Sequence, residues 1–306
     1  MPLRLVELQP DGSLLLDGHE VGLRETAVHL CWISLDIFEQ HLAARIESLL
    51  HEAAGLRWLH TVHAGLDWPI YAALLARGVR VSRSHAQAPA IAEFVLAHVM
   101  AVFQRHERIH ASQREHRWLP HPFRELASSR WLVVGAGHAG LEIARRARAL
   151  GATVVGVARG EIGDPAIGHA IKPDHLPFEL PSADVVVLSC PLTDATRDLV
   201  DRTFLAAMKD SAILVNIARG GLVDEAALLE ALDGGRLAHA ILDVTRIEPL
   251  PPDSPLWAHE RVRLTAHSAY AGSGTAARND ELFAENLRRY LAREPLLYEV
   301  SGIAAA

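Results

Sequence analysis

Apolar and polar positions divide the chain into two series of alternating strand-like and helix-like segments. In the first series an apolar run closes on HAG (63–65), a helical pattern stops at Gly78, and the short strand VRVSRS follows. A longer helical pattern runs from residue 90 to about 116, where the two prolines of WLPHPF end it. Such alternation predicts a parallel sheet with helices on its faces.

A second series of strands and helices begins at residue 130. Its helices include DEAALLEALDGG, for which Asp224 is the expected N-cap, and a closing helix that ends before Pro295. Because the two longest helices bracket this series, we expect the C-terminal tail to return to the first domain. The expected division is 1–98 with 277–306 for the first domain and 99–276 for an inserted second domain. The strands predicted in the second series lie in RWLVV (130–134), TVVGV (153–157), ADVVVLSCPLT (183–193), SAILVNIARGG, AHAILDV and RVRLTAH.

Composition is that of an ordinary globular protein and excludes several classes of function. The chain has 306 residues, 50% hydrophobic and 22% charged, with a net charge of -7. It therefore offers no positive field for nucleic acid. The start has no basic segment followed by an apolar one, and the longest apolar stretch is broken by Glu93 and His98, so we expect a cytoplasmic protein. Cys31 and Cys190 form no metal-binding pattern and are expected to be buried thiols.

A glycine-rich turn carries the first chemical signal. Gly135-Ala136-Gly137-His138-Ala139-Gly140 has the pattern G-x-G-x-x-G and stands between a predicted strand and a predicted helix. The first glycine permits a tight turn, the second lets the backbone approach a pyrophosphate, and the third allows close packing of helix on strand. The helix N-terminus faces the phosphate charge. This context predicts a dinucleotide-binding domain.

The end of the next strand bears on which dinucleotide binds. An acid that reads the ribose hydroxyls is expected about twenty residues after the glycines, but Ala158 stands there with Arg159 beside it. A guanidinium pairs well with a ribose 2′-phosphate. We therefore expect NADP(H) to be preferred, with NAD(H) possible. Two alternatives stay open: Arg159 as a solvated cation, and Glu161 as the residue that reaches the ribose.

Three polar residues follow the later strands of the second series. Arg219, Glu248 and His267 each stand beyond the end of a predicted strand, where ligands bind in open α/β sheets. An arginine holds and polarises a 2-keto acid, a histidine protonates the carbonyl oxygen, and an acid favours the protonated imidazole. For each residue alone, a packing or surface role is the favoured explanation. Together they predict the reduction of a 2-keto acid.

The chain resembles the D-2-hydroxyacid dehydrogenase family, most closely its glyoxylate/hydroxypyruvate reductases. The resemblance extends over nearly the whole chain and implies that the family's catalytic arginine, glutamate and histidine are Arg219, Glu248 and His267. It also implies a fold of two doubly wound parallel-sheet α/β domains, with a Rossmann cofactor domain inserted in a flavodoxin-like substrate domain, and a homodimer. The segments that carry it are HAGLD (63–67), APAIAEFVL (88–96), GAGHAG, CPLTDAT (190–196), NIARGGLVDEAAL (216–228), LDVTRIEPLP (242–251) and LTAH (264–267).

The resemblance further assigns binding residues. The backbone N–H groups of Ala64 and Gly65 would face the substrate carboxylate, and Trp118 would line the substrate pocket unless it serves packing. Asp243 would receive the nicotinamide carboxamide. The expected cofactor-binding residues are Gly135, Gly137, His138, Ala139, Gly140, Arg159, Cys190, Pro191, Thr196, Ile217, Ala218 and Asp243.

The chain departs from the family's pattern at three positions. Thr245 and Arg246 replace an aromatic residue and a small or polar one, and Ala266 replaces the proline usual before the histidine. Arg246 either adds positive charge at the mouth of the pocket or points into solvent. These departures affect the expected size of the substrate more than the reaction.

A second motif competes with this interpretation. His106-Glu107-Arg108-Ile109-His110 matches H-E-x-x-H, the zinc-binding motif of metalloproteases, on a predicted helix. A catalytic zinc site needs a third protein ligand, and none follows at a suitable spacing, so we expect no metal. The remaining alternative is a scaffold that senses a dinucleotide, like a corepressor, without significant turnover. The complete Arg219, Glu248 and His267 set favours an NAD(P)H-dependent reductase of small 2-keto acids.

Overall fold

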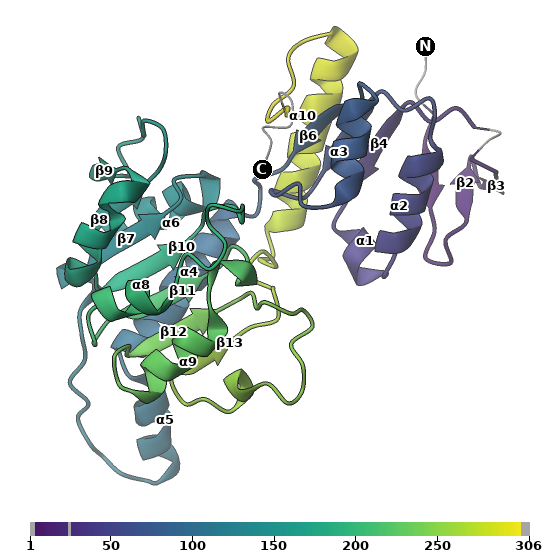
Figure 1. The fold of residues 1–306 in the computed structure, drawn as a ribbon. Coiled ribbons are helices and arrows are strands. Elements are labelled where there is room, and N and C mark those ends of the chain that lie inside the picture. The colour runs from purple at the N-terminus through teal and green to yellow at the C-terminus, as the bar shows by residue number, and fades with distance from the viewer. Residues whose placement is uncertain (1–3, 24–25, 301–306) are drawn as a thin grey trace. The chain divides into compact units, whose positions relative to one another are not determined.

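A computed structural model describes residues 4–23 and 26–300 and divides the chain into two compact units. The first unit combines Met1–Ala86 with Ser273–Ala306, and the second is Gln87–Gly272 (Figure 1). The second unit is therefore inserted into the first, as the sequence predicted.

The boundaries differ from the predicted ones at 98 and 276. The structure places the first boundary after Ala86 because α4 (Ala88–Phe103) is one continuous helix that packs on α6 (His138–Ala149). Ala92, Val95 and Val99 are buried in the core of the second unit, so the helix cannot be divided between units.

The predicted long helix is also two helices. α4 ends before Gln104, and α5 (His106–Arg114) begins after Arg105, whose φ of 56° is left-handed. An arginine in this conformation has no sequence signal comparable to that of glycine.

The first unit contains two small sheets. The parallel sheet has the order β4-β5-β6, and an antiparallel sheet that the sequence analysis did not predict has the order β1-β2-β3. The closing helix α10 (Thr275–Ala292) lies on the parallel sheet, where Phe283 stacks on Trp32 at 4.3 Å between ring centroids and Tyr290 stacks on Trp58 at 5.0 Å. The elements are β1 (Val6–Leu8), β2 (Leu14–Leu16), β3 (His19–Glu20), β4 (Leu30–Ile33), α1 (Asp36–Glu39), α2 (Ala43–Glu52), β5 (Trp58–Thr61), α3 (Pro69–Ala76), β6 (Arg80–Arg83) and α10.

The second unit is built on a seven-stranded sheet of order β13-β12-β11-β10-β7-β8-β9, parallel throughout. Alternate residues of β7 face two separate cores: Trp131 and Val133 pack with α4 and α6, while Leu132 and Val134 face α8 and α9. Figure 1 shows these helix pairs on opposite faces of the sheet. The strands are β7 (Arg130–Val134), β8 (Thr153–Val157), β9 (His169–Ile171), β10 (Val185–Leu188), β11 (Ile213–Asn216), β12 (His239–Leu242) and β13 (Val262–Leu264).

Short helices connect these strands. α9 begins at the predicted cap, because Asp224 Oδ1 accepts the N–H groups of Ala226 and Ala227, each at 3.1 Å. The helices are α7 (Leu176–Glu179), α8 (Arg202–Ala207) and α9 (Glu225–Asp233), with 3-10 turns at Leu126–Ser128, Pro173–His175, Leu180–Ser182, Gly220–Leu222 and Pro255–Trp257. In the described ranges, no helix is both long and apolar enough to cross a membrane.

A buried histidine lies in the core of the first unit. His60, on β5, has no exposed surface, and its Nδ1 lies 2.8 Å from Ser82 Oγ. Ser82 Oγ also accepts from Trp58 Nε1 at 2.9 Å. His60 Nε2 is buried and meets no partner among the described residues. Burial lowers the pKa of His60 from 6.5 to about 4, because the charged ring would lose its hydration.

We expect this histidine to make the first unit sensitive to acid. An unfolded chain protonates His60 near pH 6.5 and the folded chain only near 4, so stability is full above the unfolded value and falls as pH drops between the two. The loss amounts to about 3 kcal/mol in the free energy of unfolding. His60→Asn keeps a polar atom near Ser82 and does not titrate. Urea unfolding at several pH values should therefore give a flatter acid profile for the variant; parallel profiles would contradict the assignment.

Candidate functional site

The predicted site residues of the second unit gather at one edge of its sheet. The glycine turn follows β7, Arg159 follows β8, and Cys190 follows β10. Arg219, Glu248 and His267 follow β11, β12 and β13. All these strands are parallel, so their carboxyl ends share an edge. Chain order reverses between β7 and β10, and ligands in open α/β sheets bind outside such a switch point.

The glycine turn is packed against the strand across the switch point. Gly135 has a φ of 106°, and a Cβ there would lie 2.5 Å from the N atom of Cys190. A Cβ on Gly140 would lie 2.1 Å from the Gly135 carbonyl oxygen. Gly137, the N-cap of α6, has nothing within 4 Å of its Cβ position. The chain's own packing thus requires the outer glycines, while the middle one leaves open space before the helix N-terminus. That space fits a pyrophosphate.

Ser189 stabilises this turn through hydrogen bonds. It was not among the site residues predicted from the sequence. Its Oγ donates to the carbonyl oxygen of Gly135 at 2.6 Å and lies 3.2 Å from that of Val134. The bond joins the ends of β7 and β10 at the switch point. The only signal in the sequence is a small polar residue directly after a buried strand, which is common elsewhere.

The loop after β10 has an internal brace. Thr196 Oγ1 donates to the Pro191 carbonyl oxygen at 2.8 Å and accepts the Thr193 N–H at 2.8 Å. Thr196 thus shapes the loop, and the expected contacts of Pro191 and Thr196 with a cofactor stay predictions. Burial raises the pKa of Cys190 to about 11, so its thiol is protonated at neutral pH.

The turn after β8 carries Arg159 and Glu161, the two residues considered for contact with the cofactor's ribose. Ala158 is half-buried and its N–H donates to Ile171, whereas Arg159 and Glu161 are exposed. Neither charged side chain forms an ion pair with another described residue. Both side chains are therefore accessible to a bound ligand.

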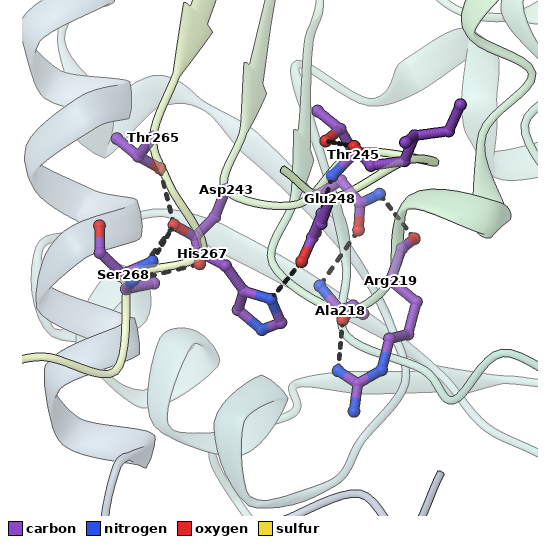
Figure 2. A network of polar contacts seen from close by, with 11 residues as sticks. Ala218, Arg219, Asp243, Thr245, Glu248, Thr265, His267 and Ser268 are labelled. Carbon is purple, nitrogen blue, oxygen red and sulfur yellow. Dashed lines mark hydrogen bonds and ion pairs between the residues drawn. The ribbon is translucent and has the colours of Figure 1, made fainter. Parts of the chain in front are cut away.

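A buried asparagine shapes the loop that carries Arg219. Asn216, at the end of β11, is 1% exposed; its Oδ1 accepts the Ala218 N–H at 3.1 Å and its Nδ2 donates to the Arg219 carbonyl oxygen at 2.9 Å. Arg219 Nη1 donates to the Ala218 carbonyl oxygen at 2.6 Å (Figure 2). Ile217 and Ala218 are buried. The sequence analysis missed Asn216, although a polar residue ending the apolar strand ILVN is a usable signal.

Gly220 brings two loops into contact. A Cβ at this position would lie 2.0 Å from both the carbonyl carbon and oxygen of Thr245 and 2.3 Å from the N atom of Arg246. The loop of Arg219 therefore touches the backbone of the loop that carries Glu248. No residue other than glycine permits this approach without movement of one loop.

His267 and Glu248 form the hydrogen-bonded pair that the sequence predicted. His267 Nδ1 lies 2.8 Å from Glu248 Oε2, and Figure 2 shows the carboxylate directed at the ring. Because a carboxylate only accepts, Nδ1 is the donor. The ring is 45% exposed and the acid 38%, so Nε2 is placed to exchange a proton with a bound molecule. The second oxygen of Glu248 accepts the Thr245 N–H at 3.0 Å.

Asp243 holds the turn that presents His267. It is 2% exposed, and its Oδ1 accepts from Thr265 Oγ1 at 2.7 Å and from the N–H of Ser268 at 2.8 Å. The Ala269 N–H lies 3.1 Å from both oxygens. The carbonyl oxygen of Asp243 accepts the His267 N–H at 2.8 Å, where φ is a left-handed 51°. Asp243 thus stabilises an uncommon backbone conformation at the predicted proton donor, and its contact with a carboxamide stays a prediction.

The substrate loop of the first unit is anchored through its carbonyl groups. Arg83 Nη1 donates to the Ala64 carbonyl oxygen at 3.2 Å, and the Ser84 N–H donates to that of His63 at 3.3 Å. Within the described ranges, the N–H groups of Ala64 and Gly65 meet no hydrogen-bond partner. Two such groups suit a carboxylate.

Two other expectations concern residues away from these loops. Trp118 is fully exposed, and its place at the substrate pocket stays a prediction. His106 and His110 lie on α5 with ring centroids 6.3 Å apart, and His106 Nε2 lies 3.0 Å from Gln104 Oε1. Across the residues described, no group of three potential ligands gathers into a metal site.

Sequence and structure comparisons place the chain among known proteins. Residues 96–269 match the NAD binding domain of D-isomer specific 2-hydroxyacid dehydrogenases. The chain is 38% identical over 206 residues to a glyoxylate reductase of Korarchaeum cryptofilum, covering 64% of this chain and 61% of that one. It is 36% identical over 259 residues to a D-3-phosphoglycerate dehydrogenase of Mycobacterium tuberculosis, covering 80% and 47%.

A solved structure agrees with these matches. A D-isomer specific 2-hydroxyacid dehydrogenase from Xanthobacter autotrophicus, in complex with NADPH and MES, superposes with a TM-score of 0.73 and 32% identity over 93% of this chain and 87% of that one. The chain therefore belongs to the D-isomer specific 2-hydroxyacid dehydrogenase family, with its NAD-binding domain and two-domain α/β fold. It spans about half the length of the D-3-phosphoglycerate dehydrogenase.

Proposed function

We propose that the protein reduces a small 2-keto acid, of the glyoxylate or hydroxypyruvate type, to the 2-hydroxy acid with NADPH. The Glu248–His267 pair supports this most directly, because its 2.8 Å contact orients a proton donor at the sheet edge where the dinucleotide turn lies. Similarity to the glyoxylate reductase supports the substrate class, and the NADPH-bound relative supports the cofactor.

The roles of the residues follow from their chemistry. A bound nicotinamide dinucleotide supplies the hydride. Arg219 holds the substrate carboxylate and polarises the carbonyl, together with the N–H groups of Ala64 and Gly65. His267 donates its Nε2 proton to the carbonyl oxygen, and Glu248 stabilises the imidazolium before the transfer. The reduction therefore consumes one proton at His267, which solvent replaces through its exposed ring.

Steady-state kinetics test the proposal. The panel consists of glyoxylate, hydroxypyruvate, pyruvate and a bulkier 2-keto acid with NADPH and with NADH, plus D-3-phosphoglycerate in the oxidative direction. We expect the highest kcat/KM for a small 2-keto acid. Absence of turnover throughout the panel would instead favour a dinucleotide-sensing scaffold.

Arg159 provides the test of cofactor choice. Arg159→Ala should raise the KM for NADPH about ten- to hundredfold and leave that for NADH nearly unchanged, since a charge-assisted hydrogen bond contributes about 1.5–3 kcal/mol. Glu161→Gln is the comparison variant. If Glu161 reads the ribose, that substitution weakens NADH binding and Arg159→Ala has no selective effect.

We also propose a homodimer. Ile109, Trp118, Leu119 and Phe123, on α5 and the segment after it, are large apolar side chains exposed on the second unit. Such a group is typical of an association surface. Light scattering of the purified protein measures the mass directly.

A further inference from the structure

Arg246 connects three loops at the edge of the sheet. Its Nη2 pairs with Asp198 Oδ1, which lies in the segment after the Cys190–Thr196 loop. The same nitrogen donates to the Val223 carbonyl oxygen at 2.7 Å, at the end of the loop that carries Arg219. Its backbone N–H donates to Glu225 Oε1 at 2.6 Å, in the first turn of α9. The sequence alone is compatible with an Arg246 side chain that adds charge at the pocket mouth and with one that points into solvent. The structure gives it partners in its own unit.

The partners of Arg246 are themselves fixed to the core. Asp198, with a left-handed φ of 52°, donates its N–H to the Gly221 carbonyl oxygen at 2.9 Å. Two residues later, the Val200 N–H donates to Leu222 at 2.9 Å. The segment after the cofactor loop and the Arg219 loop are therefore paired along their backbones, and the Arg246 guanidinium bonds to both.

Arg246 is connected to the proton donor through a short series of contacts. Its neighbour Thr245 donates an N–H to Glu248 Oε1 at 3.0 Å, and Glu248 Oε2 contacts His267 Nδ1 at 2.8 Å. Thr245 Oγ1 also donates to Ile247 at 2.9 Å, which closes the turn between Arg246 and Glu248. A shift of Arg246 would move the Thr245 N–H and, with it, the carboxylate that orients His267.

An isolated surface ion pair would do little here. Arg246 is 39% exposed and Asp198 43%, and such pairs typically contribute less than about 1 kcal/mol. Arg246 differs from an isolated pair because it also bonds to a backbone carbonyl and to Glu225. Both side-chain contacts leave from the single nitrogen Nη2, so a lysine ammonium, which carries its donors on one nitrogen, can reproduce part of them.

We propose that Arg246 is a positioning residue that fastens the Glu248 loop to the loops of the cofactor and of Arg219. This inference rests on the proposed function, because its effect is read in the reduction of a 2-keto acid. It assigns to Arg246 no contact with the substrate.

A double-mutant cycle tests the proposal. Arg246→Gln and Asp198→Asn should each lower kcat for the best 2-keto acid about three- to tenfold, with little change in KM. The double variant should fall no further than about twofold below the lower single variant, because both substitutions break the same contact. Because Glu248 would be less well held, the pH at which activity falls to half its maximum on the alkaline side should decrease by about half a unit. Arg246→Lys should recover part of kcat.

The Arg202–Glu230 pair provides the matched control. It is an exposed ion pair of the same unit, on α8 and α9. Arg202→Gln should change neither kcat nor the pH profile. A merely structural role of Arg246 would lower the active fraction without moving the pH profile, and this result, or strictly multiplicative effects in the cycle, would overturn the proposal.

A measurement without turnover separates this proposal from the proposed function. Hydrogen exchange in the full-length protein should become faster in Arg246→Gln both at 190–200 and at 244–250. Faster exchange in both loops supports the connection even if every 2-keto acid fails as a substrate. Unchanged exchange in either loop overturns it even if the enzyme is active.

Discussion

His267→Ala is expected to lower kcat for 2-keto acid reduction by about 10²–10⁴-fold, the usual contribution of a positioned general acid. The ring bonds to Glu248 at 2.8 Å and stands in a left-handed turn that Asp243 holds. The left-handed backbone conformation at His267 and its bond to Glu248 together fix the position of the imidazole ring. Removal of the imidazole leaves the turn and its hydrogen bonds to Asp243 intact, so the loss should appear in the chemical step.

Cofactor binding provides the control for this variant. The glycine turn follows β7, whereas His267 follows β13 at the far edge of the sheet. Titration of NADPH fluorescence should therefore give nearly the wild-type dissociation constant. Glu248→Gln should retain more activity than His267→Ala, because it acts only through the ring. Near-normal turnover by His267→Ala would contradict the assignment of the proton donor.

Gly220→Ala should produce a loss of similar size without touching any reacting group. Its Cβ would lie 2.0 Å from the Thr245 backbone, and overpacking at such a contact costs about 1–3 kcal/mol or forces the loops apart. Separation of the loops would displace Arg219 from Glu248 and His267, and displacements of about 1 Å can cost about 100-fold in rate. Steady-state kinetics measure the loss of kcat in this variant, and urea unfolding measures the loss in its free energy of unfolding.

Gly163→Ala is the matched control for Gly220→Ala. Gly163 lies in the same unit, its Cβ position has nothing within 4 Å, and its φ is outside the left-handed range. The substitution should leave both kcat and stability close to those of the wild type. If Gly220→Ala behaves in the same way, contact between the two loops is not needed for the site.

The strands of the second unit could be predicted closely because both of their faces are buried. β7 and β8 occupy the predicted positions 130–134 and 153–157, since each is a continuous apolar run bounded by turn residues. The break at Arg105 could not be predicted in this way, because arginine carries no signal for a left-handed φ. The antiparallel strands β1, β2 and β3 pair locally across turns that contain Asp11-Gly12 and Asp17-Gly18. These Asp-Gly pairs are a usable hairpin signal that the sequence prediction did not include.

The residues of the candidate site also fall into those that could be predicted from the sequence and those that could not. Glu248 and His267 stand after recognisable strands, so their meeting could be expected from topology alone. Ser189, Asn216 and Arg246 act through hydrogen bonds between loops distant in sequence, and no pattern along the chain indicates those partners. Arg246 is the clearest case, because its ion-pair partner Asp198 is 48 residues away.

The insertion of one unit into the other has a consequence for the order in which the protein folds during synthesis. Residues 87–272 leave the ribosome as one uninterrupted segment, and domains generally fold as units while the chain emerges. The first unit must wait for α10 and the segment that follows it: Trp32 stacks on Phe283 of α10, and Arg80 pairs with Glu299, 219 residues further on. Until the C-terminal segment emerges, the nascent chain therefore exposes the tryptophan face of β4 and β5 next to an already folded neighbour.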